Sequence, residues 1–567
     1  MNLFKKFFKT GTAMAGLLAV MCSSAQGAHP LNLYGRDAEG KNGVVAAAKP
    51  EVSQIGVDIL KKGGNAVDAA VATAFAISVF EPNASGIGGG GFILIRMAKT
   101  GKTVVIDYRE KAPAKATPDM FVLDENGKVL NDEITVGGKA SGVPGTVAGL
   151  LTALDKYGTM KREDVMAPAI KYAKEGIPVT VNLEAIIKDN YEKLAKFDAA
   201  GAVYLKDGLP YEVGDTIKNP DLADTLTKIA KNGQKAFYEG EIAKKIADEV
   251  QKQGGLITVE DMKNYKIEER TPVEGKYRGY TIISCPPASS GGTHIVQLLN
   301  MMENYDLKSM GDNTPESWHL WAESMRQVFA DRAEYMGDTA YVKVPLKGLT
   351  SKEYAKELTS KINPEKAGAG IKAGDPSKYE SGSTTHFSVM DKEGNMVAVT
   401  QTINYFFGSG VLVPGTGIMM NNEMDDFVPQ KNMKNSIEGG KRPLSSMSPT
   451  LVLDPKNRPF MTIGSPGATR IIPAVALTIS NVIDHGMSLQ EAINAPRIAQ
   501  FQSGNLNVEG RVSHDSYNKL KEMGHEMTVR DSYDAYFGGV HGIMMDYDTK
   551  TLHGGADPRR DGQAASF

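Results

Sequence analysis

The chain has 567 residues, of which 41% are hydrophobic, so it can bury a large core and could form several domains. Its 64 basic and 67 acidic residues give a net charge of −3. Because no cluster of basic residues accompanies this balance, the sequence argues against nucleic-acid binding.

The first 27 residues have the pattern of a secretory signal peptide. A basic region is followed by an apolar stretch from Thr12 to Met21 and by small residues before Ala28. The apolar stretch is too short to span a bilayer of about 30 Å as a helix, and no other segment reaches that length. Cys22 raises a lipoprotein signal as an alternative, but Met21 before it is bulkier than such signals usually permit. We therefore expect a periplasmic or secreted mature protein without a membrane span.

The elements after the signal alternate between helix and strand. Residues 50–80 read as two helices split at Gly63-Gly64, with Asn65 and Asp68 spaced to cap the second. An apolar strand follows at 92–95, and further amphipathic helices are predicted within 145–175, 220–252 and 315–335. In the last of these helices, three side chains at helical spacing are expected in the core: Trp318, Met325 and Phe329.

The stretch 361–383 is rich in small and polar residues and lacks apolar periodicity, so we expect an exposed linker there. Helices and strands are interleaved on both sides of it. This pattern predicts one layered α/β body in place of separate modules.

A hairpin follows the linker. Residues 384–390 alternate in polarity, 391–395 read as a turn with Gly394 left-handed, and 396–404 return as a second strand. If Asp391 faces Asn395, then Thr384 lies opposite Thr402, with the two hydroxyls within hydrogen-bonding reach. A slip of one residue in the register would destroy this alignment.

Thr384 would become a self-activated nucleophile if it were an N-terminal residue. A free α-amino group has a pKa near 7.7–8.0, whereas a lysine amine titrates near 10.4. Cleavage before Thr384 would therefore give one residue both a nucleophilic hydroxyl and a base suited to neutral pH. An isolated Thr-Thr pair is otherwise ordinary strand composition.

Other chemistries have weaker support. The glycines of Gly86-x-Gly88-x-x-Gly91 follow a helix and precede a strand, the reverse of a dinucleotide-binding turn, and we expect them to permit close backbone packing. The histidines are scattered and no cysteine cluster exists, so no metal or other cofactor is expected. His386 and Cys285 are expected to have structural roles. With Cys22 lost with the signal, Cys285 has no intramolecular disulfide partner.

Seven motifs, in order along almost the whole mature chain, closely resemble the γ-glutamyltransferase family. They are Gly63-Gly64-Asn65-Ala66-Val67-Asp68, Gly86-Ile87-Gly88-Gly89-Gly90-Gly91, Asp107-Tyr108-Arg109-Glu110, Ser383-Thr384-Thr385-His386, Thr402-Ile403-Asn404, Asn421-Asn422-Glu423-Met424-Asp425-Asp426 and Arg442-Pro443-Leu444-Ser445-Ser446. The resemblance implies an αββα sandwich of the N-terminal-nucleophile hydrolase type. It also implies self-cleavage between Ser383 and Thr384, giving a large subunit (28–383) and a small catalytic subunit (384–567) that share one core.

The resemblance also implies roles for individual residues. Thr384 is the nucleophile and Thr402 orients it. The substrate α-carboxylate and α-ammonium require a cation and anions held apart: Arg109, Ser445 and Ser446 for the first, and Asn404, Glu423 and Asp426 for the second. Backbone N–H groups at Gly467 and Ala468 form the oxyanion hole.

The sequence departs from the family pattern in two places. Ala468 stands where relatives have a second glycine, which is harmless to the oxyanion hole if this residue does not need a positive φ. The loop 427–440 is short and has no Tyr or Trp, whereas many relatives carry an aromatic lid there, so we expect a more open pocket.

The implied activity is cleavage of γ-glutamyl amides such as glutathione, with transfer to water or to amino acids and peptides. Two alternatives remain open. Glutaryl-cephalosporin acylases share the fold and much of the pattern, although a glutaryl group has no ammonium for Asn404, Glu423 and Asp426 to bind. An uncut homologue that captures peptides is the other, and failure to self-cleave would favour it.

Overall fold

A computed structural model describes residues 34–368 and 383–567. The predicted signal peptide (1–27) and most of the predicted linker (369–382) lie outside these ranges. The chain divides into residues 1–35 and 36–567, and the description below concerns the second unit.

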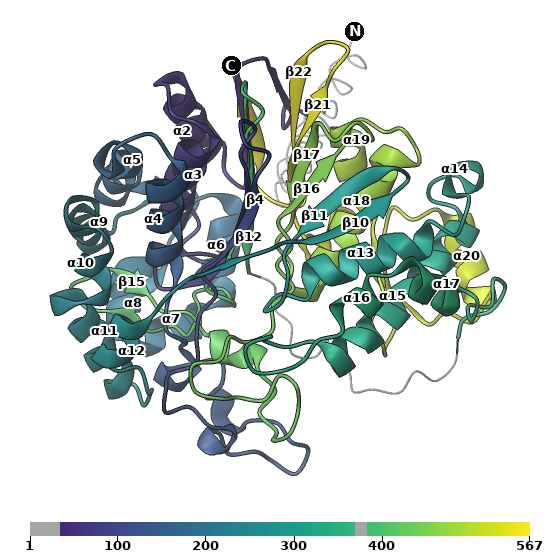
Figure 1. The fold of residues 1–567 in the computed structure, drawn as a ribbon. Coiled ribbons are helices and arrows are strands. Elements are labelled where there is room, and N and C mark those ends of the chain that lie inside the picture. Colours follow the sequence, from purple (N-terminus) through teal and green to yellow (C-terminus); the bar gives the residue numbers. More distant parts are fainter. Residues whose placement is uncertain (1–33, 369–382) are drawn as a thin grey trace, which may run out of the picture. The chain divides into compact units, whose positions relative to one another are not determined.

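Two antiparallel sheets form its centre (Figure 1). The first, seven-stranded, has the order β23 (Gln563–Ser566), β2 (Gly43–Ala47), β12 (Thr385–Asp391), β13 (Met396–Thr402), β3 (Gly90–Arg96), β4 (Thr103–Asp107) and β9 (Glu268–Arg270). The second, also seven-stranded, has the order β1 (Ala38–Gly40), β22 (Thr551–Ala556), β21 (His541–Asp546), β17 (Pro459–Gly464), β16 (Thr450–Leu453), β11 (Tyr280–Ser284) and β10 (Val273–Tyr277).

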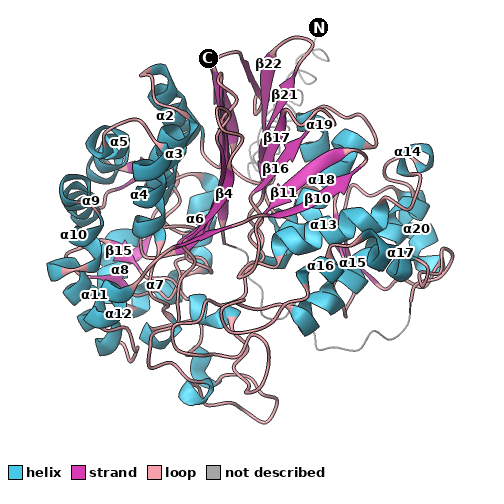
Figure 2. Ribbon diagram, viewed as in Figure 1, coloured by secondary structure: helices cyan, strands magenta, loops and turns pink. Residues whose placement is uncertain are grey.

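Helices cover the outer face of each sheet (Figure 2). On the side of the first sheet lie α2 (Pro50–Lys61), α3 (Ala66–Phe80), α4 (Thr146–Tyr157), α5 (Arg162–Glu175), α6 (Val181–Asp189), α7 (Tyr191–Lys196), α8 (Asp198–Tyr204), α9 (Pro220–Asn232), α10 (Gln234–Tyr238), α11 (Gly240–Lys252) and α12 (Val259–Asn264). On the side of the second lie α13 (Gly291–Met302), α14 (Leu307–Met310), α15 (Pro315–Tyr335), α16 (Leu346–Leu349), α17 (Lys352–Thr359), α18 (Ile471–Ile483), α19 (Leu489–Asn494) and α20 (His514–Glu522). The expected αββα arrangement is confirmed.

Shorter strands lie outside the two sheets: β5 (Ile177–Pro178) with β8 (Thr216–Ile217), β6 (Leu205–Lys206) with β7 (Leu209–Pro210), β14 (Leu412–Val413) with β15 (Ile418–Met419), and β18 (Ile498–Ala499) with β19 (Leu506–Glu509) and β20 (Met527–Arg530).

The two faces of β12 serve two different cores. Phe387 and Val389 pack in the cluster that includes α3, whereas Met390 packs in the cluster between the two sheets. His386 lies on the inter-sheet face, with Nδ1 hydrogen-bonded to Thr400 Oγ1 (2.8 Å) and Nε2 to Ser388 Oγ (3.1 Å). Burial lowers the pKa of His386 well below its usual value. The expected structural role of this histidine is therefore confirmed.

The predicted helices occur, some of them divided. The 50–80 segment is α2 and α3, and the second starts with a capping box: Asn65 Oδ1 accepts from Asp68 N (3.1 Å) and Asp68 Oδ2 accepts from Asn65 N (2.8 Å). The 145–175 segment breaks at Gly158. The 220–252 segment breaks at Gly233, whose φ of +71° does not fit a helix. Helix α15 matches its predicted range. The three side chains expected in the core, Trp318, Met325 and Phe329, are buried.

Two glycines of the run after α3 allow backbones to approach closely, as expected. A Cβ at Gly88 would lie 2.1 Å from the Met419 carbonyl oxygen, and one at Gly89 would lie 2.0 Å from the Thr402 carbonyl oxygen. The run therefore supports the end of β13, where Thr402 lies. Cys285 is a buried free thiol, in keeping with a packing role.

Candidate active site

The hairpin register places Thr384 beside Thr402. Strands β12 and β13 pair Thr385 with Gln401, and the turn closes between Asp391 and Asn395 with Gly394 at φ +82°. This register is the predicted one. The Thr384 and Thr402 hydroxyl oxygens are 3.3 Å apart.

The hydrogen bonds of Thr402 assign the direction of that contact. Its hydroxyl donates to the Ser383 carbonyl oxygen (2.8 Å) and accepts from Asn404 N (2.8 Å). Because a hydroxyl has a single proton, Thr402 must accept from Thr384. One side chain thus holds the Thr384 hydroxyl and the carbonyl of the preceding peptide bond together.

Arg109 is buried next to three carboxylates. It follows β4 at the edge of the site and pairs with Glu423 through Nη1 and with Asp426 through Nη2, while Glu110 Oε2 lies 3.6 Å from Nη1. Both anions come from the 3₁₀ turn Glu423–Asp426. The expectation that the cation and the anions are held apart is wrong for this state, because the turn lies directly against the guanidinium.

Four hydrogen bonds use all but one of the N–H groups of the guanidinium, and the remaining N–H group belongs to Nη1. Its Nε donates to the Pro443 carbonyl (3.2 Å), and Nη2 also approaches the Leu444 carbonyl (3.4 Å). A ligand carboxylate that binds through two N–H groups must therefore displace one of these partners. Asp426 is the accessible one, since its side chain is 31% exposed and that of Glu423 is 1% exposed.

Glu110 is a site residue that sequence reasoning did not select. It is fully buried, and neither carboxyl oxygen has a hydrogen-bond donor among the described residues. Burial raises the pKa of Glu110 to about 7, against the opposing effect of Arg109, and burial raises that of Glu423 well above its usual value. The only sequence signal was its place next to Arg109 in the quoted motif.

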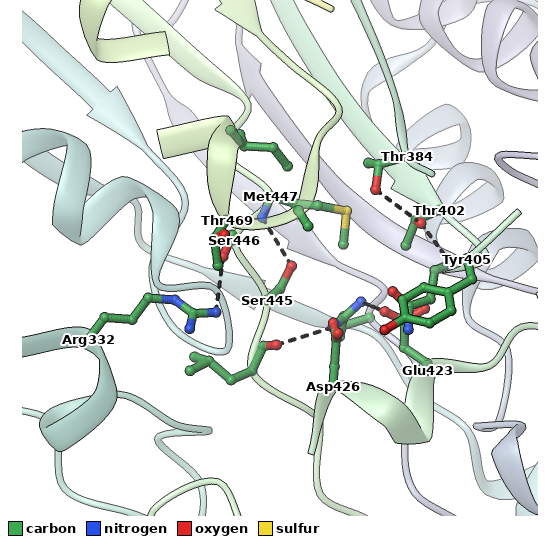
Figure 3. A pocket seen from close by; sticks show the side chains of 15 residues that line it. Arg332, Thr384, Thr402, Tyr405, Glu423, Asp426, Ser445, Ser446, Met447 and Thr469 are labelled. Atoms are coloured by element: carbon green, nitrogen blue, oxygen red, sulfur yellow. Dashed lines mark hydrogen bonds and ion pairs between the residues drawn. The ribbon is translucent and has the colours of Figure 1, made fainter. Parts of the chain in front are cut away.

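Of the remaining predicted residues, Asn404, Ser445, Ser446 and Ala468 line one pocket with Thr384 and Arg109 (Figure 3), whereas Gly467 is not among the lining residues. Asn404, at φ +73°, donates from Nδ2 to the Asn422 carbonyl (3.1 Å), and Ser445 and Ser446 follow Leu444. The pocket also contains Tyr405 and Arg332, which were not predicted. The loop 427–440 contributes no residue to the described lining, whereas Tyr405, three residues after the end of β13, supplies an aromatic ring.

One of the two residues predicted for the oxyanion hole is an alanine with a strained backbone. Gly467 has φ +127° and Ala468 has φ +51°, so the second residue is in the left-handed region that favours glycine. Ala468 lines the pocket with Thr384. The condition under which alanine would be harmless, a negative φ, is not met.

Among residues 34–368 and 383–567, no group of three acidic, histidine or cysteine side chains could hold a metal ion. Within the same ranges, no helix combines the length and apolar character needed to cross a membrane.

Comparison with known proteins assigns the chain to a family. The sequence model described as Gamma-glutamyltranspeptidase matches residues 52–567. This chain belongs to the γ-glutamyltranspeptidase family. The family and the fold expected from the motifs are therefore confirmed.

Relatives within the family carry two kinds of name. The chain is 44% identical to the Glutathione hydrolase proenzyme of Escherichia coli (strain K12), over 98% of each chain. It is 42% identical to the Acylase ACY 1 proenzyme of Pseudomonas sp. (strain SE83), over 93% of this chain and 94% of the relative. The structure of a cephalosporin acylase from Bacillus halodurans superposes with a TM-score of 0.86 at 31% identity, covering 95% of this chain and 98% of that one.

Proposed function

We propose that this protein is a γ-glutamyltransferase and glutathione hydrolase whose nucleophile is Thr384, released as an N-terminus by self-cleavage. The observation that carries the proposal is the Thr402 hydroxyl, which accepts from Thr384 and donates to the Ser383 carbonyl. The relatives named as glutathione hydrolase proenzymes support it.

Self-cleavage follows from this geometry. Thr384 Oγ1 attacks the Ser383 carbonyl carbon while the Thr402 hydroxyl stabilises the charge that develops on the carbonyl oxygen. The C–N bond breaks, the Thr384 nitrogen takes the proton that the Thr384 hydroxyl gave up, and an ester joins Ser383 to the Thr384 oxygen. Water hydrolyses the ester, which leaves a Ser383 carboxylate and a free Thr384. The products are the large subunit 28–383 and the small subunit 384–567.

The free α-amino group of Thr384 then serves as the base. It takes the hydroxyl proton as Thr384 Oγ1 attacks the γ-carbonyl of the donor, and it returns that proton to the departing amine. The oxyanion faces the N–H groups of Gly467 and Ala468. Water or the amine of an amino acid or peptide then takes the γ-glutamyl group from the acyl-enzyme.

An exchange of ion pairs would admit the glutamyl head group. In the described state Asp426 accepts from Arg109 Nη2, and Glu423 accepts from Nη1. The incoming α-carboxylate replaces Asp426 on Arg109, with Ser445 and Ser446 assisting, and the α-ammonium takes up Asp426, Glu423 and Asn404. Because charge is matched on both sides of the exchange, a zwitterionic head group suits this site better than a monoanion does.

The acylase alternative is weaker for that reason. A glutaryl group that displaced Asp426 would bring a further carboxylate and no ammonium to a buried site already holding Glu110 and Glu423. Such uncompensated charge is costly.

We also infer from residues 1–27 that the enzyme acts in the periplasm or outside the cell.

Intact-mass analysis of purified wild-type protein beside Thr384→Ala tests the proposal. We expect two wild-type chains, the smaller starting at Thr384, and one uncut variant chain. Hydrolysis of γ-glutamyl and glutaryl p-nitroanilides should then favour the γ-glutamyl compound strongly. A wild-type chain that stays intact would leave the peptide-binding alternative, and a preference for the glutaryl compound would leave the acylase.

A further inference from the structure

A second guanidinium lies at the pocket beside Ser446. Arg332, near the end of α15, donates from Nη2 to Ser446 Oγ (3.0 Å) and from Nε to Ser290 Oγ (2.9 Å). The Ser290 hydroxyl donates in turn to the Ser445 carbonyl (2.8 Å). Arg332 thus ties α15 to the pair of serines in the pocket, and Figure 3 shows it across Ser445 from Asp426.

These contacts fix what the two serine hydroxyls can do. A guanidinium only donates, so Ser446 Oγ accepts from Arg332 and keeps its own proton for another partner. Ser445 Oγ accepts from Met447 N (3.1 Å) and is in the same position. Within the described part of the chain, no acceptor for either hydroxyl proton is found. Two adjacent O–H donors suit a carboxylate.

The charges around Arg109 call for a second cation. One guanidinium there faces the carboxylates of Glu110, Glu423 and Asp426. A carboxylate that arrives next to Arg109 therefore meets an excess of negative charge. This holds even when Glu110 and Glu423, the two buried carboxyl groups, share one proton. Among the described residues that line the pocket, Arg332 is the other cationic side chain.

We propose that Arg332 is a positioning residue for the α-carboxylate of the γ-glutamyl donor, which it attracts by its charge and aligns through the Ser446 hydroxyl. This inference rests on the proposed function. It makes recognition of the α-carboxylate a property of two arginines, one after β4 and one in α15. The same contact selects for donors that carry the carboxylate.

Steady-state hydrolysis by Arg332→Gln tests this role, using γ-glutamyl p-nitroanilide and 4-aminobutyryl p-nitroanilide, which lacks only the α-carboxylate. We expect KM for the γ-glutamyl donor to rise by about tenfold or more, with little change in kcat, because a charge-assisted contact is lost. Activity on the 4-aminobutyryl donor should change by less than about twofold. Arg332→Lys, which keeps the charge but not the two-armed geometry, should fall in between.

A matched control comes from the same helix. Arg326→Gln removes a cation that pairs with Glu323 (3.4 Å) and does not line the pocket, so KM should stay near the wild-type value. Self-cleavage of each variant, followed by intact mass, verifies that the chain has folded.

The double variant Arg332→Gln/Ser446→Ala gives a second test, which does not depend on activity toward 4-aminobutyryl p-nitroanilide. If part of the effect of Arg332 passes through Ser446, the double variant should raise KM by less than the product of the two single effects. Fully multiplicative effects, or an equal loss on both donors, would overturn the inference while leaving the proposed function intact. A self-cleaved wild-type protein inactive on the γ-glutamyl donor would instead refute the proposed function itself.

Discussion

At the scale of single residues, the site depends on how one hydroxyl distributes its hydrogen bonds. Thr402 uses both lone pairs and its proton, on Thr384, Asn404 N and Ser383 O. None of these three contacts can be replaced by a methyl group. In the proposed mechanism the side chain serves self-cleavage first and, once Thr384 is an N-terminus, the alignment of the nucleophile.

Replacement of Thr402 by valine should slow self-cleavage by about 10²-fold or more, the usual effect of removing a donor from a developing oxyanion. Serine keeps the hydroxyl, so Thr402→Ser should remain within about tenfold of wild type. The measurement is the fraction of cut chain against time by intact mass. Equal rates for the two variants would show that the hydroxyl is not used.

Glu110 should make the stability of the uncut chain depend on pH. Its pKa is raised by burial to about 7 in the folded state, whereas an unfolded glutamate titrates near 4.3. The folded state therefore holds the proton more tightly, and folding stability from this group falls as pH rises from about 4.3 through about 7. In a Thr384→Ala background, Glu110→Gln should raise stability at pH 8 relative to pH 5, by up to about 3 kcal/mol.

Thermal unfolding of both chains at the two pH values measures this difference. A Glu110→Gln effect that is the same at pH 5 and pH 8 would mean that the carboxyl does not titrate in this range.

Replacement of Ala468 by glycine should stabilise the folded chain. At φ +51° its Cβ is crowded by the backbone, and Ala468→Gly removes that strain at the expense of a more flexible unfolded chain. We expect the free energy of unfolding to rise by up to about 1 kcal/mol in the Thr384→Ala background. Ala236→Gly, within α10, should instead lower it by about 1 kcal/mol. Denaturant titration distinguishes the two outcomes.

At the scale of elements, the β12–β13 hairpin could be predicted because its turn is local. Asp391 and Asn395 close it through their own backbone and side chains, so the alternation of residues 384–404 fixed which threonines face each other. The same locality explains the capping box of α3 and the range of α15.

Features that depend on distant segments could not be predicted in this way. Arg332 lies 114 residues from Ser446, and nothing in α15's pattern says which side chain reaches the pocket. The contact of Arg109 with Glu423 and Asp426 depends on distances that a motif does not carry. The positive φ of Ala468 depends on the turn after β17, whose geometry the glycine next to it only suggests.

The glycine run after α3 offers a test of how an element positions the site. A Cβ at Gly89 would lie 2.0 Å from the Thr402 carbonyl oxygen, whereas one at Gly86 would have its nearest neighbour, an Ile403 methyl group, at 3.6 Å. We therefore expect Gly89→Ala to displace the end of β13 and to slow self-cleavage severely, and Gly86→Ala to be cut at nearly the wild-type rate. Circular dichroism of both variants separates displacement from failure to fold.

At the scale of the whole molecule, the predicted cut passes through one continuous core. In the first sheet β12 and β13, from the segment after Thr384, lie between β2 and β3 from the segment before it. The C-terminal strand β23 pairs with β2 in turn. Neither segment has a complete sheet of its own.

Refolding should therefore distinguish the cut protein from the uncut one. After dilution from guanidinium, the Thr384→Ala chain should regain its circular dichroism with a yield that does not depend on concentration. The separated wild-type chains should recover little, and less at lower concentration, because their strands must now meet as two molecules. High recovery of activity from isolated subunits would contradict a shared core.

The interleaved strands also limit the working lifetime of each enzyme molecule. In the proposed self-cleavage, the bond between Ser383 and Thr384 exists only until the sheets have assembled, and the mature enzyme lacks it. Once that bond is gone, a molecule that opens has lost the connection that guided β12 into place. The working lifetime of each copy is then set by how rarely it opens, and supply must come from newly made chains.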